Sequence, residues 1–171
     1  ESGILARDSA KLILTNEDLV KYLSKHPVDL LFDSGEKFQY SNTNYALLAS
    51  VIETVSGKSF KKWMEENIIN PLKLKHTGVT YLNQSTIDKD KSAVGYIFSP
   101  SANRLLAADQ AKESKELVQS TQQIVGQGAM YSTASDLLKW NDAVQNGFLT
   151  EKEKTLIFHT DIHENESTYR F

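Results

Sequence analysis

The sequence predicts a mainly α-helical fold with a few short strands, and two observations carry this prediction. Residues that commonly cap helix N-termini precede stretches in which apolar side chains recur every three or four positions. Glycines and prolines then follow these stretches, where helices usually end. We therefore expect five helices, which begin near Thr15, Asn42, Ser59, Thr133 and Thr150. A chain of 171 residues is long enough to form a single domain with its own hydrophobic core.

The first predicted helix begins at Thr15, and Asp18 stands at the position from which a capping box reaches back to the cap residue. Pro27 marks the end of this helix, because the residue before a proline disfavours helical geometry. The apolar positions of the helix predict an inner face. They are Leu19, Tyr22 and Leu23.

The second predicted helix covers residues 42–56, and Gly57 follows it where a helix ends in a left-handed residue. Its apolar side chains have the spacing of one helical face, so we expect that face to lie in the core. The face consists of Tyr45, Leu48, Ile52 and Val55, with Leu47 and Val51 beside it.

The other three predicted helices have the same kind of start. The third begins at Ser59 and closes at Pro71, and its apolar residues are Phe60, Trp63, Met64 and Ile68. Thr133 and Thr150 begin the last two, each with an acidic residue at the capping-box position, Asp136 and Glu153. The fourth ends at Gly147, and its inner face is expected to contain Leu137, Trp140 and Val144. The fifth is short, with Leu156 and Ile157 as its apolar residues.

The remaining stretches are less regular. Residues 79–82 and 94–98 have the composition of short strands. Residues 86–91 and 105–117 are polar and weakly patterned, and we interpret them as surface loop. The polar tail, residues 159–171, is expected to be loose. His159 and His163 are four residues apart in that tail, and we interpret them as solvated side chains rather than as metal ligands.

The composition excludes several classes of function. Hydrophobic residues make up 40% of the chain and charged residues 24%, and the net charge is −3. The chain therefore has no basic field that would attract nucleic acid. Cysteine is absent, which excludes disulfides and cysteine nucleophiles and is compatible with either a cytoplasmic protein or an exported bacterial one.

The segment before the second helix contains the candidate site. If residues 40–42 are extended, Tyr40 and Asn42 point to the same side and Ser41 points to the other. The structural alternative is that Ser41 or Asn42 is only the helix N-cap and that Tyr40 only packs.

Three stretches in the same order resemble the serine β-lactamase-like family, which includes class C β-lactamases, D-alanyl-D-alanine carboxypeptidases, penicillin-binding proteins and related esterases. They are residues 35–45 (GEKFQYSNTNY), residues 70–78 (NPLKLKHTG) and residues 126–137 (GQGAMYSTASDL). The first contains the Tyr-x-Asn motif of that family. The resemblance covers nearly the whole chain and implies the helical lobe of the family's α/β fold.

The resemblance also implies roles for individual residues. Tyr40 takes the position of the catalytic acid/base, and Asn42 that of the residue that holds the catalytic lysine and a substrate carbonyl. Gln127 and Gly128 resemble the loop that walls the substrate cleft. The implied substrate is a β-lactam, a peptide that ends in D-alanine, or an ester, and no cofactor or metal is implied. A parent enzyme would reside in the bacterial periplasm, in the cell envelope or outside the cell, or else in the cytoplasm.

The family's other two motifs have no convincing match. Ser34 and Lys37 form a Ser-x-x-Lys pair within a turn, and Ser59 and Lys62 form one that follows Tyr40 instead of preceding it. We interpret both as coincidences, with Ser59 as an N-cap. We expect the chain to be a segment of a longer hydrolase, inactive by itself, whose partner is the α/β lobe of the same protein. The alternative is a binding or regulatory module that kept the fold and lost the reaction.

Overall fold

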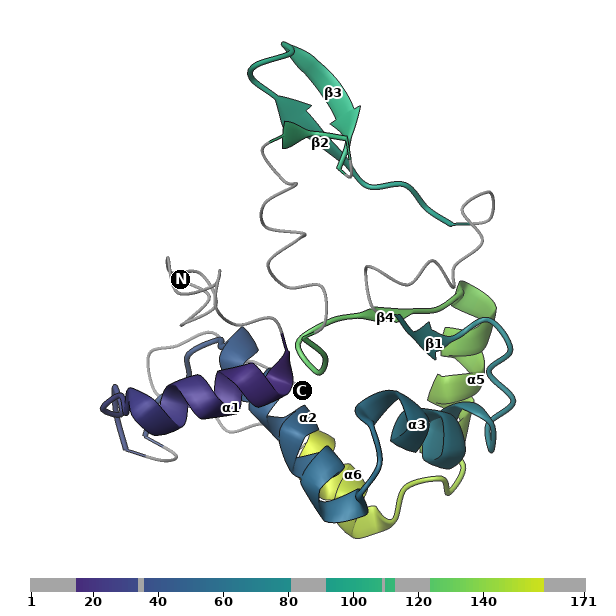
Figure 1. The fold of residues 1–171 in the computed structure, drawn as a ribbon. Coiled ribbons are helices and arrows are strands. Elements are labelled where there is room, and N and C mark those ends of the chain that lie inside the picture. The colour runs from purple at the N-terminus through teal and green to yellow at the C-terminus, as the bar shows by residue number, and fades with distance from the viewer. Residues whose placement is uncertain (1–14, 34–35, 81–91, 109, 113–123, 159–171) are drawn as a thin grey trace.

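Figure 1 shows the fold in the computed structural model, which describes residues 15–33, 36–80, 92–108, 110–112 and 124–158. Each of the five predicted helices is present, and they are α1 (Asn16–Lys25), α2 (Asn42–Ser56), α3 (Phe60–Met64), α5 (Ala134–Gln145) and α6 (Glu151–Phe158). The described strands are short: β1 (Gly78–Val79), β2 (Tyr96–Ser99), β3 (Arg104–Ala107) and β4 (Met130–Tyr131). The prediction of a mainly α fold with a few short strands is therefore confirmed. No helix in the described ranges combines the length and the apolar character needed to cross a membrane.

Local capping explains why the helices begin where they do. At α1 the Thr15 hydroxyl accepts the N–H of Asp18, while the Asp18 carboxylate accepts the N–H of Thr15. Thr150 and Glu153 form the same reciprocal pair before α6. Ser59 caps α3 by accepting the N–H of Lys62. Each of these caps satisfies amide groups that a helix leaves without a partner in its first turn.

The third predicted helix changes its winding. After α3 the chain continues as a π-helical segment, η3 (Glu65–Ile69), in which hydrogen bonds join residues five apart. In this wider turn Ile69, five residues after Met64, lies on the same buried side of the helix as Met64. Ile69 and Met64 are both buried, whereas Ile68 is half-buried.

The strands form two separate antiparallel pairs. Val79 of β1 is opposite Met130 of β4, and β2 and β3 form a hairpin that lies apart from the helices in Figure 1. The expectation of surface loop from residue 105 was wrong for β3, and β4 was not predicted. In β3 two exposed side chains are followed by two half-buried ones, so this strand lacks the alternation between two faces that identifies a strand from sequence, and β4 has only two residues.

The orientation of α2 differs from the prediction. Its buried residues are Thr43, Ala46 and Ala49, while Leu48 and Val55 of the predicted inner face are exposed. The reason is the close approach of the segment before β4. A Cβ atom added to Gly126 would lie 2.7 Å from the Cβ of Ala49, so only small side chains fit on this side of the helix. Leu48, Val51 and Val55 therefore face outward, whereas Leu47 and Ile52 are half-buried and pack against the core, as the prediction had it.

Among the residues that the structure describes, two clusters of buried side chains form the core, and α2 contributes to both. The larger contains Ala49, Phe60, Met64, Ile69, Leu74, Val79 and Val125. The smaller contains Leu19, Ala46 and Ile124. Residues 124 and 125 are adjacent in sequence and belong to different clusters, so this segment joins α1 and α2 to α3 and the β1–β4 pair. Its position matters because residues 126–128 follow directly.

Candidate active site

Tyr40 and Asn42 form a hydrogen-bonded pair at the start of α2. The Tyr40 hydroxyl donates to Oδ1 of Asn42 over 2.8 Å. Ser41 between them has extended backbone angles (φ −145°, ψ 108°), which place Tyr40 and Asn42 on one side, and its own hydroxyl accepts the N–H of Asn44. Ser41 is therefore the N-cap of α2, and this role leaves Tyr40 and Asn42 available for another one. The Tyr40 side chain is half exposed, at 51%.

A hollow of about 340 Å³, which we call the glycine hollow, adjoins Tyr40. It is lined by Tyr40, Tyr45, Gly126, Gln127, Gly128 and Met130. Three of the four residues singled out from the sequence, Tyr40, Gln127 and Gly128, thus lie around one space, although they are almost ninety positions apart in the chain. Asn42 does not line this hollow and reaches it only through its bond to Tyr40.

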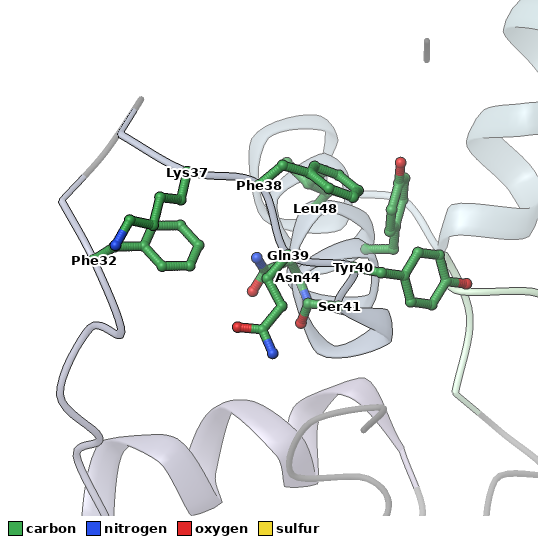
Figure 2. A pocket seen from close by; sticks show the side chains of 9 residues that line it. Phe32, Lys37, Phe38, Gln39, Tyr40, Ser41, Asn44 and Leu48 are labelled. Carbon is green, nitrogen blue, oxygen red and sulfur yellow. The ribbon is translucent and has the colours of Figure 1, made fainter. Parts of the chain in front are cut away.

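A second hollow of about 370 Å³, which we call the aromatic hollow, also contains Tyr40 and Tyr45 in its wall. Phe32, Lys37, Phe38 and Leu48 are among its other wall residues. Figure 2 shows the Tyr40 ring at one end of this space and Phe32 and Lys37 at the other. Tyr40 and Tyr45 therefore line both hollows, one that Lys37 also lines and one that Gly126 and Gly128 also line.

Asn16 holds the two parts of the site together, and no local pattern of residues indicates this role. Its side-chain N–H group donates to the carbonyl oxygens of Ala46 (2.8 Å) and Val125 (3.0 Å), and its Oδ1 accepts the N–H of Val125 (2.9 Å). Asn16 is 5% exposed. These three bonds connect α2, which carries Asn42, to the segment that carries Gln127 and Gly128.

The candidate nucleophile pair at Ser59 does not have the geometry of one. The Ser59 hydroxyl accepts a backbone N–H, and the Lys62 ammonium lies 3.9 Å from the Glu66 carboxylate. The N-cap interpretation of Ser59 is therefore confirmed. Ser34, His159 and His163 lie outside the described residues. Within the described ranges, no three histidine, aspartate or glutamate side chains are grouped so that they could hold a metal ion.

The family follows from a direct match. Residues 1–166 match the family model described as Beta-lactamase, and the chain therefore belongs to this family of serine hydrolases.

Individual relatives agree with this assignment. Penicillin-binding protein 4* of Bacillus subtilis (strain 168) is 31% identical over 152 residues, a match that covers 88% of this chain and 33% of that protein. The D-alanyl-D-alanine-carboxypeptidase/endopeptidase AmpH of Escherichia coli (strain K12) is 27% identical over 150 residues, which cover 84% of this chain and 34% of the relative. The chain thus spans about a third of the length of these relatives.

Solved structures show the same fold. The octameric penicillin-binding protein homologue from Pyrococcus abyssi superimposes with a TM-score of 0.66 and is 26% identical, over 93% of this chain and 33% of that one. The D-amino acid amidase from Ochrobactrum anthropi SV3 superimposes with a TM-score of 0.65 over 93% of this chain and 44% of its own, at 21% identity, a level at which the likeness concerns the fold alone. The described part of this chain corresponds to a mostly helical portion of that fold.

Proposed function

We propose that this chain supplies the Tyr-x-Asn part of the active site in a longer serine hydrolase. The observation that carries the proposal is the hydrogen bond between Tyr40 and Asn42 beside the hollow that Gln127 and Gly128 line. The chain matches only about a third of its relatives' length, which supports the view that the serine nucleophile and its lysine are supplied by another part of the protein.

In the proposed reaction, the serine oxygen attacks the carbonyl carbon of the substrate, and the bond from this carbon to the leaving nitrogen or oxygen breaks. Tyr40 passes the serine proton to the leaving group, which departs neutral. Water then attacks the acyl-enzyme and restores the serine hydroxyl. The Asn42 side-chain amide has both a donor and an acceptor, so it can hold the lysine ammonium and a substrate group at once.

The proposed substrates are acyl compounds: a peptide ending in D-alanine, a β-lactam or an ester. The names of the relatives support this range, because they include penicillin-binding proteins and a D-alanyl-D-alanine carboxypeptidase. Gln127 and Gly128 would wall the cleft beside the bound acyl group. Apart from its two chain neighbours, no atom of the described residues lies within 4 Å of the position that a Cβ atom on Gly128 would take, so there is open space beside this residue.

The test is Tyr40→Phe in the longer protein. Loss of a proton-transfer group is expected to lower kcat by roughly two to four orders of magnitude. The matched control is Tyr22→Phe, since Tyr22 stacks on His26 in α1 and does not line either hollow. Asn42→Ala is expected to weaken turnover as well. If Tyr40→Phe turns over substrate as fast as the Tyr22→Phe control, Tyr40 has only a structural role, and a binding module without catalysis becomes the better interpretation.

A further inference from the structure

The outward side of α2 has the composition of a buried surface. Leu48, Val51 and Val55 are spaced three and four residues apart, so they form one stripe along the helix. Their exposed fractions are 57%, 56% and 83%. On the opposite side, Ala46 and Ala49 are fully buried against the core. The helix is thus apolar on two opposite sides, and a helix of this kind is usually buried on both.

The distribution of charge on α2 agrees with this interpretation. Among its fifteen residues only Glu53 is charged, and the Glu53 carboxylate accepts the N–H of Phe60 at the start of α3. The stripe therefore carries no charged group that would favour contact with water. By contrast, α6 has four charged residues among eight, as expected of a helix that faces solvent.

The stripe is continuous with the candidate active site. Leu48 is its first member and also lines the aromatic hollow together with Phe38 and Tyr40. A structure that covers the stripe would therefore extend to the Tyr40 side chain. It would also close one side of the space in which Tyr40 acts.

We propose that the Leu48–Val51–Val55 stripe is the docking surface for the part of the longer enzyme outside residues 1–171, and that this same part brings the serine nucleophile to Tyr40. The inference rests on the proposed function and adds the surface that joins the two parts. The relatives' length favours this occupant, because about two-thirds of each relative lies outside the matched region. A second copy of the chain is a poorer occupant, since on this face it would cover the aromatic hollow without supplying a nucleophile.

Thiol labelling tests the proposal, because the chain contains no cysteine of its own. Val51→Cys and Val55→Cys place single thiols on the stripe. Asn141→Cys is the control, an exposed position in the interior of α5. In residues 1–171 alone, the three thiols should react with a small maleimide at similar rates. In the longer protein, the rate of the unsubstituted protein is first subtracted. The two stripe thiols should then react at least about ten-fold more slowly than in residues 1–171 alone, because the helix face is buried. The rate of the control thiol should be the same in both proteins.

Two results would overturn the proposal. One is equal reactivity of the stripe and control thiols in the longer protein, which would mean that the face stays in water. The other is protection already in residues 1–171 that disappears on dilution, which would assign the face to a second copy. Measuring Tyr40→Phe turnover in the same protein separates the two claims. Protected thiols with unchanged turnover support the docking surface and reject the proposed role of Tyr40, and reactive thiols with lost turnover do the reverse.

Discussion

At the scale of single residues, the pair at the start of α2 was predictable and the residue that positions it was not. Tyr40 and Asn42 are neighbours in sequence, so extended geometry at Ser41 was enough to place them together. Asn16 bonds to Val125, which lies 109 positions away, and no local pattern contains that information. From the sequence alone, Asn16 is simply a residue in the first turn of a capped helix.

Asn16→Ala should therefore destabilise the protein. It would remove the Asn16 partners of both backbone groups of Val125 in a buried location, and one of the hydrogen bonds to the Ala46 carbonyl, which also accepts the Ser50 hydroxyl. Each buried polar group left without a partner costs about 1–3 kcal/mol, so a loss of roughly 2 kcal/mol or more in the free energy of unfolding is expected. Urea denaturation followed by circular dichroism measures it. Asn67→Ala is the control, since Asn67 is exposed and bonds only within its own helical segment, and a change below about 0.5 kcal/mol is expected there. Equal effects of the two substitutions would contradict this account of Asn16.

At the scale of elements, local chemistry predicts where the helices begin but does not predict which face of a helix is buried. Capping residues act within three positions, and the predicted starts of all five helices agree with the structure. The face that α2 buries depends on what approaches it: Gly126 lies close to Ala49, and Ala46 packs with Leu19 and Ile124. β3 was missed because its side chains do not alternate between two faces, and β4 because it has only two residues.

At the start of α5, the residue at the capping-box position, Asp136, makes long-range contacts. Thr133 caps the helix by accepting the N–H of Asp136, as predicted, but the Asp136 carboxylate does not complete a capping box. It is buried and instead accepts the Lys139 ammonium, the N–H of His76 and the hydroxyl of Thr77. The Lys139 ammonium chiefly, with the His76 and Thr77 donors, holds the pKa of Asp136 below its ordinary value, although burial opposes the shift.

Asp136→Asn should therefore lower the urea midpoint in a pH-dependent manner. A carboxyl whose pKa is lowered by folding stabilises the native state fully above its unfolded pKa, near 4, and this contribution is lost as the pH falls through the lower native value. The difference in midpoint between the native chain and Asp136→Asn should be greatest at neutral pH and shrink below about pH 4. Asp142→Asn, at an exposed position of the same helix, should show no such trend. A difference that is constant from pH 7 to pH 3 would show that the charge of Asp136 is not what stabilises the contact.

At the scale of the whole molecule, many large apolar side chains in the described part of the chain are exposed to solvent instead of packing in the core. The α2 stripe is one example, and the β2–β3 hairpin is another, with Tyr96, Phe98 and Leu105 more than half exposed. Large exposed apolar patches mark surfaces that bind something. The spacing of apolar residues predicts which of them share a face. It does not show whether another segment of the same 171 residues covers that face. The fold class was predictable because helices are local, whereas burial of these surfaces depends on contacts that local patterns do not encode.

The proposed function therefore predicts that this chain alone does not turn over substrate. Covalent catalysis needs a serine held against a base and donors aimed at the carbonyl oxygen. Ser59 does not meet this need, because its hydroxyl caps α3 and the nearby Lys62 ammonium faces Glu66. Losing the nucleophile of a serine hydrolase lowers kcat on the order of a million-fold, which would put the chain at the level of buffer. The assay uses purified residues 1–171 with a chromogenic cephalosporin and a p-nitrophenyl ester, and Ser59→Ala and Ser34→Ala as paired variants. All three proteins should match the buffer rate, and turnover by the native chain that disappears in either variant would identify that serine as the nucleophile and reject the need for a second part.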